Sequence, residues 1–240
     1  MKSPIRLLTL ISILFVIVFS QFANPHSVQA ACAPNHIIYV RPTGTNAGGC
    51  SWVSAFTTLQ SALAIATSGD QIWVASGTYY PDEGTGQTNN DQASTFVLID
   101  GVSIYGGFAG TPGTEALFVR NSNPATNNTV LSGDIDQDGL DADNASTVVT
   151  ITGILTDTFI LDGFTITNGY EDSGAGLGGG IYIEDASPTL SNLIITNNLA
   201  NSNGGGVFVV SNATVEANYS SPVLTDVIIS NNTAARGGGL

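Results

Sequence analysis

Hydrophobic and polar residues alternate in three similar segments in the last third of the chain. The segments are 161–168, 190–197 and 224–231, and their leading leucines recur after 29 and 34 residues. Glycine triplets at 178–180 and 204–206 each precede a short β-prone run, and a third triplet at 237–239 closes the chain. A period of this size, made of short strands and glycine turns, predicts a stacked solenoid.

Every second residue of these segments shares one face of its strand. Phe164, Leu193 and Val227 therefore begin equivalent rows, each of which continues through isoleucine and ends in asparagine. Coils stacked at about 4.8 Å would place like residues on like. Since an amide carries both a donor and an acceptor, the row ends are predicted to form an internal ladder. The ladder residues are Asn168, Asn197 and Asn231. The alternative is that these asparagines serve only as turn residues.

An amphipathic helix is predicted between Ser54 and Ala66, where apolar residues fall at helical spacing. Strands are predicted at 36–40 before it and at 71–75 after it. A solenoid exposes an unpaired apolar first coil, so we expect this helix to cap that end. The expected organisation is an amino-terminal strand and capping helix at 31–70, followed by β-helix coils at 71–240.

The first 30 residues resemble a secretory signal peptide. Lys2 and Arg6 precede a 13-residue apolar run, and Val28-Gln29-Ala30 forms a small-x-small cleavage pattern. The run is too short to span a bilayer comfortably. We expect cleavage after Ala30 and secretion to the cell surface or the medium. A lipid-modified cysteine at Cys32 is the alternative, although Gln29 stands where such sites carry a large aliphatic residue.

The net charge limits the classes of binding partner, and the two cysteines predict a disulfide. Residues 31–240 carry 19 acidic side chains against three arginines, which gives a formal net charge of −16. Such a surface excludes nucleic acid and an anionic membrane as natural partners, and we expect no membrane insertion. Cys32 and Cys50 are the two cysteines, and in an oxidising compartment they are expected to form a disulfide. Closing that loop would stabilise the fold by about 3 kcal/mol in the chain-entropy model.

Several motifs follow one another in a recognisable order along the chain. They are Ile38-Tyr39-Val40, Ser51-Trp52, Gly69-Asp70-Gln71-Ile72-Trp73-Val74-Ala75, Asp100-Gly101-Val102-Ser103-Ile104-Tyr105-Gly106-Gly107-Phe108, Leu131-Ser132-Gly133-Asp134-Ile135 and Leu161-Asp162-Gly163-Phe164. This series resembles the amino-terminal part of secreted bacterial right-handed parallel β-helix proteins. That group is related in fold to pectate lyases and includes polymorphic outer-membrane-protein-like and choice-of-anchor surface proteins. The resemblance covers roughly residues 37–240. It implies an all-β, single-stranded right-handed parallel β-helix of about seven coils and a role at the cell surface.

One acidic segment carries candidate metal chemistry. Residues 134–143 hold five aspartates and a central glycine, in the D-x-D-x-D-G spacing that supplies oxygen ligands to Ca²⁺. The twelfth position is Ala145, so the bidentate glutamate of an EF-hand is missing. We predict a structural Ca²⁺ loop and no other cofactor, and the alternative is a solvated turn. The candidate ligands are Asp134, Asp136, Asp138, Asp141 and Asp143.

Two aromatic residues are candidates for ligand binding. Tyr182 and Phe208 follow their glycine triplets at matching positions, on the strand face opposite the neighbouring aliphatic residues. Stacked outward, they would form a ridge that binds a glycan or a surface protein. The alternative is local aromatic stacking that only stiffens the coils.

Catalytic residues are not predicted. His36 is the one histidine after the leader, and the arginines at 41, 120 and 236 are far apart in sequence. Asp162 and Asp226, which we place at equivalent repeat positions, are interpreted as turn residues. The sequence therefore favours a non-catalytic secreted or cell-surface scaffold for adhesion or for glycan or protein binding. The alternative is a lyase or glycoside hydrolase acting on acidic polysaccharide. Because the chain stops directly after a glycine triplet, we expect it to be a fragment with further modules beyond Leu240.

Overall fold

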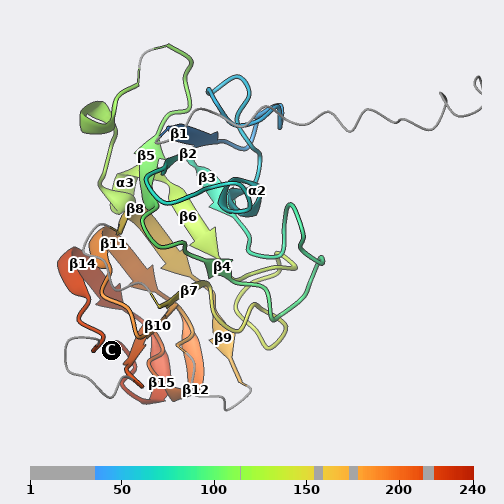
Figure 1. Ribbon diagram of the computed structural model, residues 1–240. Coiled ribbons are helices and arrows are strands. Elements are labelled where there is room, and N and C mark those ends of the chain that lie inside the picture. The colour runs from blue at the N-terminus through green and yellow to red at the C-terminus, as the bar shows by residue number, and fades with distance from the viewer. Residues whose placement is uncertain (1–35, 114, 154–158, 173–177, 213–218) are drawn as a thin grey trace, which may run out of the picture. The chain divides into compact units, whose positions relative to one another are not determined.

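Parallel strands dominate the computed structural model, which describes residues 36–113, 115–153, 159–172, 178–212 and 219–240 (Figure 1). All of these belong to the unit formed by residues 31–240. The largest sheet contains β1 (Ile37–Val40), β2 (Gln71–Ala75), β5 (Ser103–Phe108), β8 (Ile160–Thr167), β11 (Thr189–Thr196) and β14 (Val223–Ser230), in that order. Strands β3 (Gly77–Tyr79) and β6 (Thr129–Ser132) extend it, because β6 pairs with both β3 and β8.

Two smaller sheets complete the coils. One contains β4 (Phe96–Val97), β7 (Val149–Thr152), β10 (Ile181–Glu184) and β13 (Val207–Val210), and the other contains β9 (Tyr170–Glu171), β12 (Leu199–Asn203) and β15 (Thr233–Arg236). Consecutive strands of one coil thus enter different sheets, and each strand pairs in parallel with strands of the neighbouring coils. The predicted right-handed parallel β-helix is confirmed.

The predicted stacking of equivalent residues is also confirmed. Leu193 of β11 pairs with Phe164 of β8 on one side and with Val227 of β14 on the other. The next inward residue, Ile195, pairs in the same way with Ile166 and Ile229. Side chains of the two inner coils are fully buried in the core, whereas those of β14 are only partly buried. The core is therefore built from files of aliphatic and aromatic side chains that run from coil to coil.

The predicted number of about seven coils is too high for the described residues, which form six rungs of the largest sheet. The first half of β8 pairs with β5 and its second half with β6, so β5 and β6 are two parts of one rung. Residues 109–128 interrupt this rung and contain the short helices η1 (Leu117–Val119) and α3 (Pro124–Asn127). This insertion lengthens one repeat without adding a rung.

The glycine triplets stack on one another at the start of β10 and β13. Gly180 N donates to Gly205 O at 3.0 Å, and Gly206 N donates to Gly238 O at 3.0 Å. A Cβ atom at Gly205 would lie 2.3 Å from the carbonyl oxygen of Thr233. Glycine is required there because the backbones of adjacent coils approach too closely for a side chain.

The capping helix is shorter than predicted. Helix α2 contains only Leu59–Leu63, and it packs against β1 and β4, which are terminal strands of their sheets. Phe56 instead forms a parallel bridge to Val40, and its N–H donates to Tyr39 O. These backbone hydrogen bonds hold residues 54–58 outside the helix. The apolar residues appear at helical spacing because residues before the helix, such as Phe56, and residues within it, such as Leu59, are both buried.

Left-handed residues stack in the middle of the longest strands. Gly163, Asn192 and Asp226 have φ angles of +87°, +47° and +53°. They occupy equivalent positions in β8, β11 and β14, and the regular strand pairing skips all three of them. Asp162 pairs with Ser191, which pairs with Thr225, so the prediction that Asp162 and Asp226 are equivalent is wrong. Glycine, asparagine and aspartate recur here because they tolerate this backbone conformation best.

The asparagine ladder lies one residue later than predicted. Asn168, Asn197 and Asn231 all have left-handed φ angles, between +55° and +62°, and the last two are exposed. The ladder is formed by Asn198 and Asn232. The N–H of Gly169 donates to Asn198 Oδ1, and the N–H of Asn198 donates to Asn232 Oδ1, both at 2.9 Å. The turn interpretation is therefore the correct one for the predicted residues, because a left-handed residue redirects the side chain that follows it.

Candidate functional site

The aspartate-rich segment forms a loop between β6 and β7, and one of its carboxylates folds the loop. Asp134 Oδ1 accepts hydrogen bonds from the N–H groups of Asp138 and Gly139, at 2.9 and 3.0 Å. Asn144 is fully buried, and its Nδ2 donates to Gly139 O at 3.0 Å and to Asn168 O at 2.9 Å. Asp134 is thus placed apart from the other predicted ligands, as the residue that shapes their loop.

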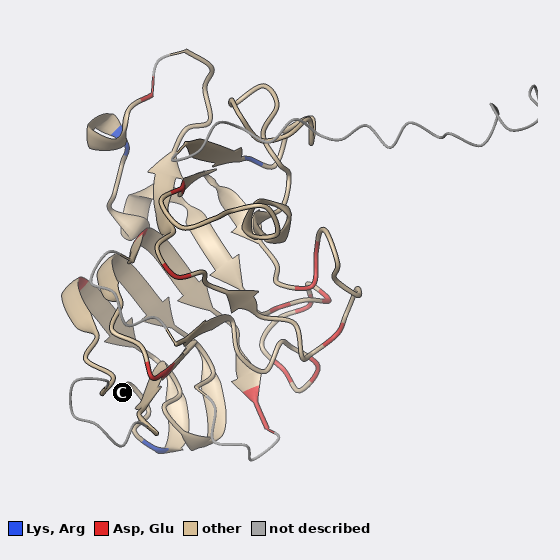
Figure 2. Cartoon of the chain, viewed as in Figure 1, with Lys and Arg blue, Asp and Glu red and all other residues tan. Residues whose placement is uncertain are grey.

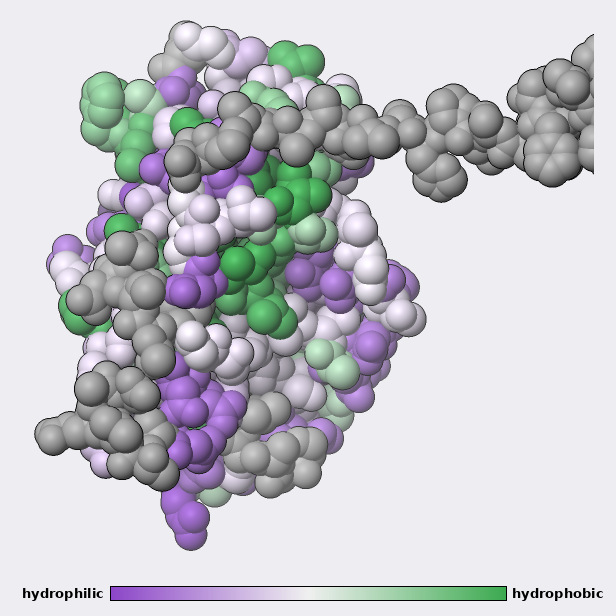
Figure 3. Space-filling view, in the orientation of Figure 1, coloured by the Kyte–Doolittle hydropathy of each residue, from purple (hydrophilic) through white to green (hydrophobic). Residues whose placement is uncertain are grey.

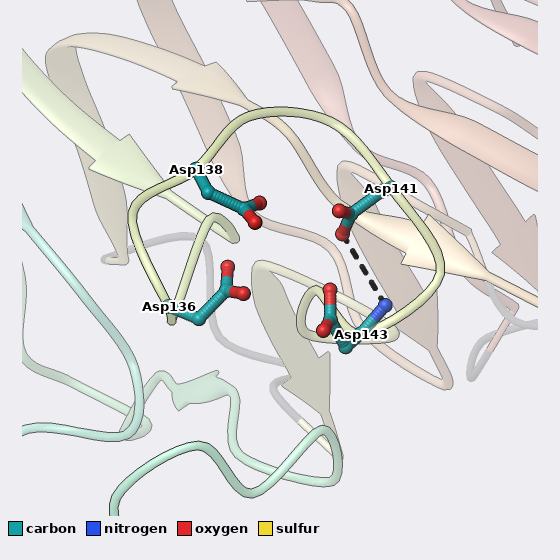
Figure 4. A group of neighbouring side chains, drawn as sticks. All are labelled: Asp136, Asp138, Asp141 and Asp143. Atoms are coloured by element: carbon teal, nitrogen blue, oxygen red, sulfur yellow. Dashed lines mark hydrogen bonds between the residues drawn. The ribbon is translucent and has the colours of Figure 1, made fainter.

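The remaining four predicted ligands come together. Asp136, Asp138, Asp141 and Asp143 each offer an oxygen atom, and these atoms lie within 4.8 Å of one another. Figure 4 shows their carboxylates pointing toward a shared space inside the loop. Oδ1 of Asp136 is buried and accepts no hydrogen bond from the described residues. Oxygen atoms grouped in this way match the ligand type that hard divalent cations prefer. Ala145 at the twelfth position is fully buried, so the loop has no EF-hand glutamate to complete it.

Electrostatic crowding perturbs these carboxyl groups. The negative charges of Asp136 and Asp141 raise the pKa of Asp138. A hydrogen bond to Asp141 raises the pKa of Asp143 to about 6, and the same contact lowers the pKa of Asp141. The pair therefore shares a proton under mildly acidic conditions, as expected when like charges are forced together. A bound cation would relieve this repulsion.

Tyr182 and Phe208 occupy paired positions of β10 and β13, on the outward face of their sheet. Their ring centroids lie 6.1 Å apart with an angle of 32° between the planes. Ile181 and Val207 beside them are fully buried, which confirms that the aromatic side chains point away from the core. Burial, a hydrogen bond to Glu184 and the negative charges of Glu184 and Asp185 together raise the pKa of Tyr182 to about 12. The phenol is therefore neutral at physiological pH, and its O–H donates to Glu184.

A buried ion pair was missed by the sequence reasoning. Arg120, in the insertion before α3, pairs with Asp162 of β8 and also donates to Gly106 O at 2.8 Å. Asp162 Oδ2 accepts further hydrogen bonds from Ser191 Oγ at 2.5 Å and Asn192 Nδ2 at 3.0 Å. The repeat pattern gave no signal for this contact, because Arg120 belongs to a segment that occurs once. The arrangement ties the insertion to the sheet and occupies both oxygens of Asp162.

Most of the other charged side chains are acidic, and they lie mainly in loops (Figure 2). Figure 2 shows acidic residues gathered in the loops at the right of the view, while the arginines lie far apart. Asp70 is buried beside His36, with 3.1 Å between Asp70 Oδ1 and His36 Nδ1. Cys32 and the signal-peptide residues 1–30 lie outside the described residues, so the disulfide to Cys50 and the cleavage after Ala30 stay predictions. A separate finding concerns membrane spans. Within the described residues, no helix has the length and apolar character needed to cross a bilayer.

Comparison with known proteins identifies the family. The family model described as "Protein of unknown function (DUF1565)" matches residues 42–238, so the chain belongs to this family. No curated protein matches the sequence. Among solved structures, the chain is similar to the deglycosylated pectin methylesterase from Aspergillus niger, with a TM-score of 0.40, 18% identity and coverage of 86% of this chain and 60% of that one. It is also similar to a rhamnogalacturonan lyase, with a TM-score of 0.41, 17% identity and coverage of 80% and 51%. The chain thus spans between half and two thirds of these proteins, and at these scores the two likenesses decide neither its fold nor its activity.

Proposed function

We propose that this member of the family is a non-catalytic secreted or cell-surface scaffold. Its outward β4–β7–β10–β13 sheet face binds a glycan or a protein. The observation that carries the proposal is the paired position of Tyr182 and Phe208, whose rings lie beside one another on adjacent coils at a tilted angle and leave part of their surface exposed. Aromatic side chains on a rigid sheet provide a large contact area at low cost in conformational entropy. The predicted leader at residues 1–30 and the disulfide at Cys32 and Cys50 belong to the same proposal.

The placement of the polar side chains supports a scaffold more than an enzyme. Glycoside hydrolysis requires two carboxyl groups that converge on a substrate. Here Asp162 is bonded to Arg120, Ser191 and Asn192, and Asp70 is bonded to Thr67 and His36, so these carboxylates maintain the fold. The aspartates of the loop at 136–143 face one another (Figure 4).

An assay for products separates the scaffold from the alternative, a lyase or hydrolase of acidic polysaccharide. The secreted full chain is incubated with pectic and other acidic glycans, with and without Ca²⁺, and the solution is followed for unsaturated or reducing ends. We expect neither above the level of a heat-denatured sample. Steady product release by the purified chain would replace the scaffold with an enzyme.

A Ca²⁺ ion in the aspartate loop is part of this proposal. Asp136, Asp138, Asp141 and Asp143 would hold it, and its role would be to fix the loop between β6 and β7 without entering a reaction. The fit is supported by the crowded carboxylates and by the buried, unpartnered Oδ1 of Asp136. Asp134 would shape the loop through its hydrogen bonds to backbone N–H groups.

Calorimetry and thermal unfolding of the full chain test the ion. We expect Ca²⁺ to bind the chelator-treated protein and to raise its Tm, and we expect Asp141→Asn to abolish both effects. Asp226→Asn is the matched control, because it removes one exposed carboxylate at a left-handed position whose equivalent in β11 is already Asn192. A Tm that does not respond to Ca²⁺ or to chelator would eliminate the ion and leave a solvated loop.

A further inference from the structure

A groove of about 430 Å³ lies between α2, the loop at 81–95 and β4. Leu63, Ala64, Val97 and Ile99 supply its apolar surface, and Gln87 and Asp91 contribute polar groups at its edge. Figure 3 shows hydrophobic surface around α2 and β4 on this face, bordered by hydrophilic residues. A groove of this size, apolar with a few polar groups, has the character of a small-ligand site.

Hydrogen bonds hold the walls of the groove in place. Gln60 of α2 is buried, and its Nε2 donates to Pro81 O at 2.6 Å and to Thr95 O at 3.0 Å, which fixes both ends of the loop to the helix. Ser61 Oγ accepts from the N–H of Thr85 at 3.2 Å. The groove is therefore preformed, and a ligand would not have to order the loop on binding.

The lining determines which ligands the groove accepts. Among the described residues that line it, Asp91 carries the one charge and none is basic. Asp91 Oδ1 already accepts from the N–H of Ala93 at 3.0 Å, so Oδ2 remains for a ligand hydroxyl. An acidic sugar would bring its carboxylate toward Asp91 without a cation to neutralise it. A neutral saccharide has apolar C–H faces for the floor and hydroxyl donors for Asp91 and Gln87.

The groove continues into the row that carries the aromatic pair. Val97 pairs with Thr150, Thr150 pairs with Tyr182, and Tyr182 pairs with Phe208, so these four side chains lie on one outward line across the sheet. Val97 is 50% exposed and lines the groove. Three steps at strand spacing give a row of roughly 14 Å, long enough for an extended chain of sugar rings.

We propose that the groove binds one end of a neutral, linear oligosaccharide whose following residues lie along Thr150, Tyr182 and Phe208. This inference rests on the proposed binding function and gives it a ligand class. The apolar floor receives the first ring, Asp91 and Gln87 accept and donate to its hydroxyls, and the aromatic rings contact the C–H faces of later rings.

Titration calorimetry of the full chain with neutral and acidic oligosaccharides tests the inference. The probes are xylo- and cello-oligosaccharides of increasing length, and oligogalacturonides of matched length represent the acidic class. We expect one neutral series to bind with an affinity that rises with length, and the oligogalacturonides to bind at least tenfold more weakly. Asp91→Asn is expected to reduce that preference.

Two tryptophan variants in the turn directly after α2 provide the site test. Ala64→Trp fills the groove from an exposed position and is expected to weaken binding at least tenfold, whereas Ile65→Trp, which does not line the groove, leaves it unchanged. Thermal unfolding followed by circular dichroism checks that both variants are folded. Tyr182→Ala is expected to weaken the binding of long oligosaccharides more than short ones.

The outcomes separate this inference from the proposed function. Binding that Tyr182→Ala weakens and Ala64→Trp leaves intact would overturn the groove while keeping the outward face as a binding surface. Failure of both neutral series to bind, or tighter binding of oligogalacturonides, would also overturn the inference. Release of products from any glycan would instead overturn the non-catalytic function.

Discussion

At the scale of single residues, the asparagine doublets after β11 and β14 divide two tasks between neighbours. The first asparagine, Asn197 or Asn231, adopts the left-handed conformation that turns the chain out of the strand. The second, Asn198 or Asn232, directs its amide to the backbone of the preceding coil. In the β8 coil the doublet is Asn168-Gly169, and the N–H of that glycine is bonded by Asn198.

Substituting the two asparagines of one doublet is expected to give unequal losses. Asn198→Ala removes the acceptor for Gly169 N–H and the donor for Ile166 O in a site that is 1% exposed. Each buried group left without a partner costs about 1–3 kcal/mol, so we expect the free energy of unfolding to fall by roughly 2–4 kcal/mol. Asn197→Gly keeps the left-handed turn and is expected to change it by less than about 0.5 kcal/mol. Urea unfolding measures both changes. A larger loss for Asn197→Gly than for Asn198→Ala would show that the ladder is formed by Asn197, as the sequence predicted.

The sequence predicted the residue type and the column of this ladder but not the residue that forms it. Strict alternation holds only while the backbone stays extended, and Asn197 with φ +56° ends that alternation directly after the strand's last residue, Thr196. The doublet contains the needed signal, since a turn residue and a ladder residue would both be asparagine. Arg120 and Asp162 lie beyond any such signal, because their contact joins a unique insertion to a repeated strand.

Removal of the buried arginine should be costly. Arg120→Met leaves the carboxylate of Asp162 without its cation in a site where both side chains are almost fully buried. An uncompensated buried charge costs about 3–5 kcal/mol, and we expect a loss of that size in the free energy of unfolding. Arg236→Met, at an exposed position of β15, is the control and should change stability by less than about 0.5 kcal/mol. Urea unfolding of the double variant Arg120→Met, Asp162→Leu should recover much of the loss, because both charges are then absent.

At the scale of elements, the first coil is held by one carboxylate that joins the chain before β1 to the turn after α2. Asp70 Oδ2 accepts from the N–H and the hydroxyl of Thr67, at 2.8 and 2.9 Å, and Oδ1 accepts from the N–H of His36 at 3.2 Å. Burial alone would raise the pKa of Asp70, but these hydrogen bonds and the neighbouring His36 outweigh it and lower the pKa below its ordinary value. The ionised form therefore stabilises the cap.

This arrangement predicts an acid-sensitive cap. Because the folded pKa of Asp70 is lower than the unfolded one, its stabilisation is present above the unfolded value of about 3.9 and is lost as the pH falls through the folded value. We expect Asp70→Asn to cost roughly 1.5–3 kcal/mol at pH 7, with the difference from the wild type shrinking below about pH 4. Urea unfolding between pH 3 and 7 measures it. A constant difference over this range would mean that the hydrogen bonds do not depend on the charge.

Elements that carry a full repeat were the predictable ones. Strand β2 occupies the predicted residues 71–75. Strands β8, β11 and β14 begin and end one residue before the aligned segments, because burial of one strand face imposes alternation on the sequence and the asparagine that closes each segment lies in the turn. The predicted helix at 54–66 was too long, since Phe56 is apolar for a different reason, the bridge to Val40. The four loop aspartates were predictable as a group because their spacing is local, whereas the groove beside α2 combines residues 60–64 with residues 85–99.

At the scale of the whole β-helix, stability is expected to be distributed along the files of stacked side chains. In a solenoid each coil contacts only its neighbours, so the value of a side chain depends on how many coils cover it. Ile166, Ile195 and Ile229 occupy one file in consecutive coils. The first two are fully buried and the third is partly buried, which makes them a series of identical residues in graded surroundings.

The same truncation along this file should therefore have a graded cost. Ile166→Ala and Ile195→Ala remove methylene groups from a closed core, and each is expected to lower the free energy of unfolding by about 2–5 kcal/mol. Ile229→Ala removes groups that already contact water, and a loss of about 1 kcal/mol follows from its partial burial. Urea unfolding at two protein concentrations measures the series. Equal losses at all three positions would contradict the gradient. A loss at Ile229 that grows with protein concentration would show that a second chain covers this coil in solution, since association contributes to stability only when it is populated.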